Sequence, residues 1–176
     1  MKAERTQRKQ FILAVSGVKN SGKTTLITKI LPFLKAKGLN VAVIKHDGHD
    51  FEADVPETDS WKFAKAGADG TLVFSKTKYM MIHYDTVLPE EDLLASFPRA
   101  DIILLEGFKY SDYPKIEIIR KGNSMMSVCN PERLMAIATN LDAEERDTLP
   151  ILEKIPFFEL DNAKSIAEFI LSDYFH

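Results

Sequence analysis

Short apolar runs alternate with amphipathic segments along much of this chain. Four of the runs are short and rich in branched aliphatic residues, which is typical of buried strands. They cover residues 11–16, 41–44, 102–105 and 134–138. After the first run, apolar residues from Leu26 to Leu34 recur at helical spacing, and Gly38 predicts the end of that helix. Strands and helices that alternate in this way predict an α/β fold with a mostly parallel sheet.

Weaker patterns predict the remaining elements. Apolar runs at 71–74 and 79–84, separated by a polar turn, indicate an antiparallel hairpin. Residues 115–120 alternate charged and apolar side chains, so we expect a strand with one face exposed to solvent. The other predicted elements are a helix capped within 58–60 and ended by Gly67, a helix at 90–97, a strand at 157–160 and a final helix capped by Asp161.

The loop between the first strand and the first helix carries a specific motif. Residues 17–24 match G-x-x-x-x-G-K-[ST], the phosphate-binding P-loop or Walker A motif. Glycines let backbone N–H groups turn toward an anion, Lys23 reaches the terminal phosphates in a catalytic role, and the Thr24 hydroxyl is placed to ligate Mg²⁺. A glycine turn that carries this pattern by chance is the alternative, but strand, loop and helix are the context that the motif requires. The residues assigned to phosphate binding are Gly17, Val18, Lys19, Asn20, Ser21, Gly22, Lys23 and Thr24.

The motif and its neighbours predict a P-loop NTPase-type three-layer α/β fold, with a mostly parallel sheet and antiparallel hairpin additions. We expect one nucleotide-binding domain over residues 11–176, after a frayed N-terminus at 1–10. The net charge of −3 argues against a general nucleic-acid binder. The single Cys129 excludes an intramolecular disulfide and fits a reducing cytoplasm. No stretch approaches the roughly 18 apolar residues of a membrane span, so no membrane partner is expected.

Acidic residues after two predicted strands are candidates for the metal site. A P-loop enzyme needs an acidic group near Mg²⁺, at the end of a buried neighbouring strand. Glu106 ends the run at 102–105 and is the first candidate, with a solvent-facing strand end as the alternative. The acidic segment 46–54 should lie near the γ-phosphate. We assign Asp47 to a catalytic or metal contact and Asp54 to the metal, because hard oxygen ligands suit Mg²⁺, and a solvated loop is the alternative.

One further carboxylate is a candidate for reading the base. Asp142 follows the core strand at 134–138, and a carboxylate can accept two hydrogen bonds from the guanine N1–H and N2 amine. Adenine offers no such pair of adjacent donors. An Asp between a strand and a helix is often only a helix cap, so guanine reading and capping both stay open.

Several segments together resemble the MobB family of GTP-binding proteins, the molybdopterin-guanine dinucleotide biosynthesis adapters. The resemblance runs from about residue 11 to about residue 140. Its most distinctive part is Leu105-Glu-Gly-Phe-Lys109, followed by Pro114-Lys-Ile-Glu-Ile118 and Arg120. The other matching segments are Val15–Leu26, Val43–Asp47, Asp54–Pro56, Asp59–Trp61 and Ala66–Ala68.

The resemblance implies a protein that binds GTP with Mg²⁺, hydrolyses it weakly at best and forms homodimers by sheet extension. The implied partner is a molybdenum cofactor guanylyltransferase, which joins GMP to molybdopterin, and direct binding of molybdopterin stays open. By position, Gly17 to Thr25 would hold phosphates and Glu106 would lie at the metal. Lys45, His46 and Asp47 would lie near the γ-phosphate.

Two other functions remain as alternatives. A small-molecule kinase would use the same P-loop, but the arginines are scattered and form no lid-like cluster. A GTPase metallochaperone would use His46, His49 and Cys129, although the sequence holds no Cys-x-x-Cys and no His-rich tract. No arginine finger and no glutamine placed to orient water is evident, so weak GTPase activity is the most that we expect. Lys19 is a partial substitute for such a finger or, as the alternative, an exposed loop lysine.

Overall fold

The computed structural model describes residues 9–48, 51–84, 87–150 and 155–175. The chain divides into two compact units, one formed by Met1–His46 with Phe97–His176 and the other by Asp47–Ser96. The expectation of one domain over 11–176 stays a prediction, and residues 1–8 of the expected frayed start lie outside the described residues.

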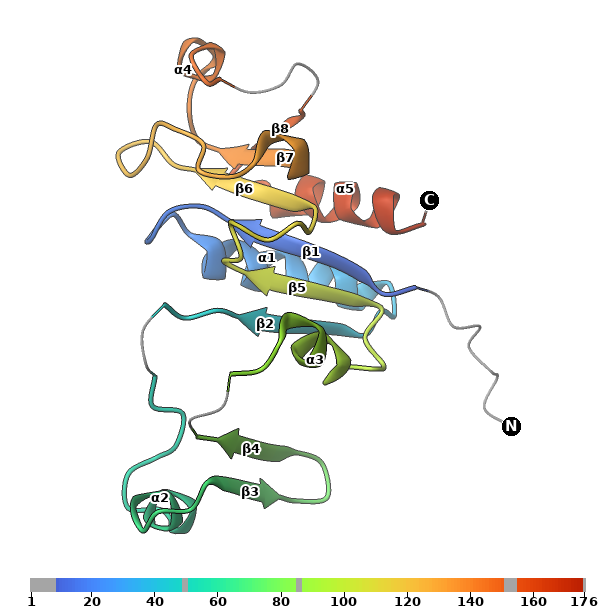
Figure 1. The fold of residues 1–176 in the computed structure, drawn as a ribbon. Helices are drawn as coiled ribbons and strands as arrows, with labels where there is room; N and C mark the ends of the chain where they lie inside the picture. Colours follow the sequence, from blue (N-terminus) through green and yellow to red (C-terminus); the bar gives the residue numbers. More distant parts are fainter. Residues whose placement is uncertain (1–8, 49–50, 85–86, 151–154, 176) are drawn as a thin grey trace, which may run out of the picture. The chain divides into compact units, whose positions relative to one another are not determined.

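The first unit is built on a parallel sheet (Figure 1). Among the described residues this sheet has six strands in the order β2-β5-β1-β6-β7-β8, and every neighbouring pair is parallel. The strands are β1 (Phe11–Ser16), β2 (Val41–Lys45), β5 (Ile102–Glu106), β6 (Lys115–Ile119), β7 (Leu134–Thr139) and β8 (Phe157–Glu159). The helices of this unit are α1 (Lys23–Ala36), the 3₁₀ turn η1 (Pro131–Arg133), α4 (Ala143–Asp147) and α5 (Ala163–Phe175). The predicted α/β fold with a mostly parallel sheet is confirmed.

Helices α1 and α5 pack together on the sheet and share one apolar core with it (Figure 1). On α1 the apolar positions predicted from helical spacing, Leu26 to Leu34, supply buried side chains. On α5 the buried residues include Ile166 and Ile170, which join the same cluster. This packing fixes the first turn of α1 directly after the P-loop, so the core holds the loop in place.

The strand at 115–119 differs from its prediction. All five residues of β6 are buried, including Lys115 and Glu117, so the expected solvent-exposed face is wrong. The alternation itself is real, since Ile116 and Ile118 join the core under α1 and α5 while Ile119 joins a second cluster. Loop segments contact the charged face and supply polar partners to its two charges.

The cap of α5 also differs from its prediction. The Asn162 side chain accepts a hydrogen bond from the backbone N–H of Ser165, which is the contact of a helix cap. Asp161 lies one residue too early for that role and instead pairs with Lys29 of α1, with Nζ and Oδ1 2.9 Å apart. Asp161 is therefore a surface group beside the start of α1, and not the cap.

The second unit contains α2 (Asp59–Lys65), β3 (Gly70–Phe74), β4 (Tyr79–His83) and α3 (Glu90–Ala95). Strands β3 and β4 pair antiparallel, which confirms the predicted hairpin. No helix in the described parts of either unit is long and apolar enough to cross a membrane.

Candidate nucleotide site

The P-loop lies between the end of β1 and the start of α1, and its backbone demands glycine. Gly17 has φ +140°, and a Cβ there would lie 2.7 Å from the carbonyl oxygen of Ile118 on the neighbouring strand β6. Gly22, directly before α1, has φ +104°. Because side chains rarely tolerate these angles, the glycine positions of the motif follow from the turn itself.

Lys23 folds back over the loop that it follows. Its Nζ donates hydrogen bonds to the carbonyl oxygens of Val18, at 2.7 Å, and Gly17, at 3.3 Å. Burial lowers the pKa of Lys23, the Glu106 carboxylate opposes that shift, and the positive charges of Lys109 and Lys45 add to it. Three lysines therefore share one electrostatic neighbourhood with a single carboxylate, which favours binding of a highly charged anion.

Thr24 and Glu106 meet beside the P-loop. Strand β5 lies next to β1, with Glu106 opposite Val15 in the parallel register. The Thr24 hydroxyl donates a 2.7 Å hydrogen bond to Glu106 Oε1, and the Glu106 side chain is buried. A hydroxyl and a carboxylate are hard oxygen donors of the kind that Mg²⁺ binds, so this pair fits a magnesium ion between the protein and the phosphates.

Strand β2 brings further predicted residues to the same edge of the sheet. Lys45 lies opposite Glu106 in the parallel register, and the backbone N–H of His46 donates to the Glu106 carbonyl oxygen. The His46 ring contacts Phe108 edge-on, with ring centroids 5.8 Å apart. The end of β2 is thereby fixed to the segment that follows Glu106.

The acidic segment after β2 belongs to the second unit. Asp54 there accepts hydrogen bonds at Oδ1 from the Val55 backbone and the Thr58 hydroxyl, so it orders the turn before α2. Hydrogen bonds to Asp54, first that from Ser60, lower the pKa of its carboxyl group. The metal roles of Asp47 and Asp54 stay predictions, and His49 lies outside the described residues. Within the described segments no group of three or more His, Cys, Asp or Glu residues is placed to hold a metal ion.

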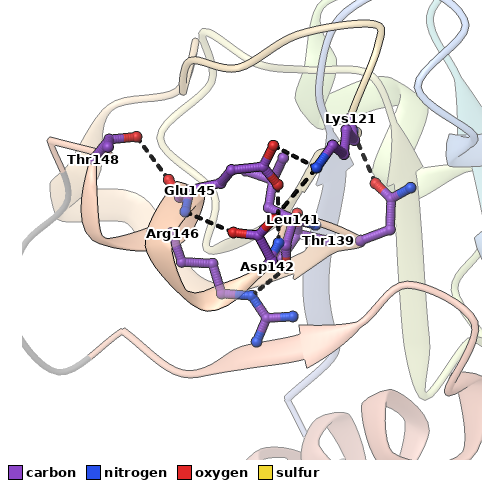
Figure 2. Close-up of polar contacts among 8 residues, drawn as sticks. Lys121, Thr139, Leu141, Asp142, Glu145, Arg146 and Thr148 are labelled. Carbon is purple, nitrogen blue, oxygen red and sulfur yellow. Dashed lines mark hydrogen bonds and ion pairs between the residues drawn. The ribbon is translucent and has the colours of Figure 1, made fainter.

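Asp142 caps helix α4 (Figure 2). Its Oδ1 accepts a hydrogen bond from the Glu145 backbone N–H, and the Glu145 side chain accepts one in return from the Asp142 N–H. Lys121 Nζ lies 3.3 Å from Asp142 Oδ2. The structure therefore gives Asp142 the capping role that the sequence left open, and guanine reading by this residue stays a prediction.

A small hollow of about 120 Å³ opens beside the start of α1. Its walls come from the P-loop, from α1 and from the ends of β6, β7 and β8. The lining residues are Gly22, Thr25, Leu26, Lys29, Arg120, Asn140, Leu160 and Asp161.

Arg120 lies beside the P-loop, although the arginines are scattered along the sequence. One of its terminal nitrogens lies 3.8 Å from the position that a Cβ on Gly22 would occupy. Only the paired order of β1 and β6 brings these two residues together.

Two further residues were missed as partners of the site. Lys115 Nζ donates to the carbonyl oxygens of Ser111, at 2.6 Å, and Phe108, at 3.3 Å. It therefore holds the turn that begins just after Glu106-Gly107. Glu117 accepts hydrogen bonds from the Ser127 hydroxyl and the Val128 N–H. The one signal in the sequence was the Pro114-Lys-Ile-Glu-Ile118 segment, which carried the family resemblance without a stated role.

A profile of the family described as "Molybdopterin guanine dinucleotide synthesis protein B" matches residues 12–140. The chain belongs to this family. Among curated MobB relatives, the molybdopterin-guanine dinucleotide biosynthesis adapter protein of Escherichia coli is 32% identical over 168 residues, 91% of each chain. The adapter protein of the same name from Haemophilus influenzae is 33% identical over 148 residues, 82% of this chain and 83% of the relative.

A solved MobB structure shares the fold. The crystal structure of Bacillus subtilis MobB superposes with a TM-score of 0.69 at 28% identity, and the match covers 92% of this chain and 96% of that chain. The resemblance stated from the sequence is thus confirmed at the level of family and of fold.

Proposed function

We propose that this protein is a GTP-binding adapter in molybdenum cofactor biosynthesis, which assists a guanylyltransferase in forming molybdopterin guanine dinucleotide. The names of its MobB relatives support the biosynthetic role. The observation that most directly supports the nucleotide role is the hydrogen bond between Thr24 and Glu106 beside the P-loop. Bound Mg²⁺ would neutralise charge on the phosphates, with Thr24 Oγ1 and the Glu106 carboxylate as its protein ligands.

Slow hydrolysis is part of the proposal. Efficient GTPases orient water with a glutamine and stabilise the transferred phosphoryl group with an arginine, which together raise the rate by several orders of magnitude. The described glutamine, Gln10, precedes β1 and donates to the carbonyl oxygens of Phe97 and Ala100, at the strand end opposite the P-loop. Gln10 therefore cannot orient water at the P-loop, which favours holding GTP over rapid turnover.

The metallochaperone alternative receives no support from Cys129. This thiol is buried, and desolvation followed by the nearby Glu117 carboxylate raises its pKa to about 12. Metal ions bind the thiolate, which is scarce at neutral pH when the pKa is this high. We therefore retain the adapter as the proposed function.

Assembly and location complete the proposal. We propose a homodimer formed through the β3–β4 hairpin, because an isolated two-stranded sheet is marginally stable and this one exposes several apolar side chains. A cytoplasmic location fits the single buried cysteine. Molybdopterin is a candidate ligand whose direct binding would be measured separately.

The experiment that tests the function is a calorimetric titration of the purified protein with GTP and with ATP, each with and without Mg²⁺. We expect GTP to bind more tightly than ATP and Mg²⁺ to strengthen GTP binding. Thr24→Val removes the hydroxyl while keeping side-chain volume, so it should abolish most of the Mg²⁺ effect. Equal affinity for GTP and ATP would overturn the guanine part, and retention of the Mg²⁺ effect in Thr24→Val would overturn the metal assignment. A pull-down of the guanylyltransferase with and without GTP tests the adapter part.

A further inference from the structure

The hollow beside the start of α1 has the position of a base subsite. Its volume of about 120 Å³ is smaller than an engineered cavity of roughly 150 Å³ that encloses benzene, so this open hollow would hold one edge of a base and not a whole nucleotide. Gly22 and Thr25 line it, so it borders the loop that would hold the phosphates. A nucleotide whose phosphates lie on the P-loop can therefore place another part of itself here.

The polar groups of the hollow come from four separate elements. Lys29 lies one helical turn after Thr25 on α1, while Arg120, Asn140 and Asp161 follow β6, β7 and β8. The Asn140 side-chain oxygen already accepts a hydrogen bond from the Lys121 backbone N–H. Within the described part of the chain the Arg120 guanidinium has no hydrogen-bond or ion-pair partner, although its charge helps to lower the pKa of Asp161. The carboxylate of Asp161 pairs with Lys29, with side chains 90% and 46% exposed respectively.

Asp161 is more available to a ligand than Asp142. Both oxygens of Asp142 have protein partners, one in the cap of α4 and one in the contact with Lys121 (Figure 2). Among the described residues the ion pair of Asp161 is with Lys29, a half-exposed lysine, and ion pairs of this kind contribute little to stability. A ligand that binds Asp161 therefore displaces little, whereas a ligand that binds Asp142 competes with a helix cap.

We propose that this hollow binds the guanine base and that Asp161 determines base specificity. The proposal rests on the proposed GTP-binding function and deepens it. The Asp161 carboxylate accepts hydrogen bonds from guanine N1–H and from the N2 amine, and Lys29 keeps the carboxylate at the rim of the hollow. Arg120, next to Gly22, contributes positive charge toward the phosphate end of the nucleotide and does not distinguish bases.

The test exchanges donors and acceptors between residue 161 and the base. In Asp161→Asn an amide N–H replaces one acceptor, which opposes the guanine N2 amine but matches the C2 carbonyl of xanthine. We expect this variant to lose at least tenfold in GTP affinity and to gain affinity for xanthosine triphosphate. Asp142→Asn is the matched control, because asparagine also caps helices, and it should keep the GTP preference of the natural chain. Arg120→Ala should weaken GTP and xanthosine triphosphate binding by similar factors.

Each outcome separates the subsite from the broader function. If the natural chain binds no GTP, the proposed function fails. If it prefers GTP over ATP but Asp161→Asn behaves as the natural chain does, the function stands and the subsite is overturned. A switch toward xanthosine triphosphate in Asp142→Asn instead would also overturn the subsite. Inosine triphosphate lacks the N2 amine, so it should bind the natural chain less tightly than GTP. It should bind the Asp161→Asn variant at least as tightly as GTP binds that variant.

Discussion

Lys115 and Glu117 lie two residues apart on the same face of β6, and both side chains are buried. A buried charge is costly unless hydrogen bonds replace the water that it has lost. Here Lys115 donates to the carbonyl oxygens of Phe108 and Ser111, and Glu117 accepts from the Val128 N–H and the Ser127 hydroxyl. Two loops are thereby attached to a central strand, one of them directly after Glu106-Gly107.

Removal of the Lys115 charge should destabilise the protein. Lys115→Met keeps the long apolar stem but removes the 2.6 Å hydrogen bond to the Ser111 carbonyl oxygen, whereas the Phe108 carbonyl oxygen keeps its bonds from the Ser111 N–H and hydroxyl. We expect a loss of about 2 to 4 kcal/mol in the free energy of unfolding, measured by urea denaturation. Lys164→Met is the control, because Lys164 is exposed and its Nζ forms only a long ion pair, 3.9 Å from Glu168 Oε1. This variant should change the free energy of unfolding by less than about 0.5 kcal/mol. Equal stabilities for the two variants would contradict the structural role of the buried ammonium.

At the scale of the elements, α4 shows how a five-residue helix is held. Its N-terminus carries a full capping box from Asp142 and Glu145, and Lys121 reaches both carboxylates (Figure 2). Arg146 donates to the Leu141 carbonyl oxygen and pairs with Glu159 at the end of β8. So short a helix has little stability of its own, and these side-chain contacts supply most of its order.

The cap predicts how α4 responds to substitution and pH. Asp142→Ala should lower the melting temperature, while Asp142→Asn should nearly preserve it because asparagine is an equally good cap.

The backbone N–H of Glu145 is the main cause that holds the pKa of Asp142 below its usual 3.8, with Lys121 adding to it. A carboxyl group whose pKa is lower in the folded than in the unfolded chain stabilises the fold at pH values above its unfolded-state pKa. That stabilisation is lost as the pH falls through its folded-state pKa. The melting temperatures of natural and Asp142→Ala chains, measured from pH 7 to pH 2.5, should therefore converge below about pH 3.8.

The sequence predicted those elements whose causes are local. Apolar runs and helical spacing identified β1, β5, β7 and α1, and the P-loop motif identified the turn between β1 and α1. The polarity of β6 was misread because its partners, in 108–111 and 127–128, come from loops that no periodicity places. The sequence predicted Asp161 as the cap of α5, but Asn162 has that role. Both are polar residues that can cap a helix, and only the exact start of the helix shows which of them does so. Arg120 could be placed beside Gly22 only once the strand order was known.

At the scale of the whole molecule, the β3–β4 hairpin presents an apolar face that the described residues leave exposed. Leu72 and Phe74 lie on one face of β3, and their cross-strand neighbours are Met81 and Tyr79. All four side chains are at least half exposed, at 55%, 78%, 54% and 70% respectively. Contiguous exposed apolar residues of this kind mark interaction surfaces in soluble proteins. The hairpin is therefore the part of the chain where we expect the proposed homodimer to form.

A double substitution tests this assembly without touching the nucleotide site. Leu72→Glu with Phe74→Glu places two like charges on the hairpin face, and two copies would bring four of them together. Light scattering should give the natural chain a mass of about twice its 19.9 kDa and the variant a mass near that of one chain. Lys76→Glu, in the turn between the strands, is the control for added negative charge and should stay dimeric. Because the P-loop belongs to the other unit, GTP affinity per chain should stay within about twofold of the natural value, which would show that the variant is folded. A natural chain that is monomeric even at high protein concentration would contradict the homodimer. A double variant that remains dimeric would show that the interface lies elsewhere.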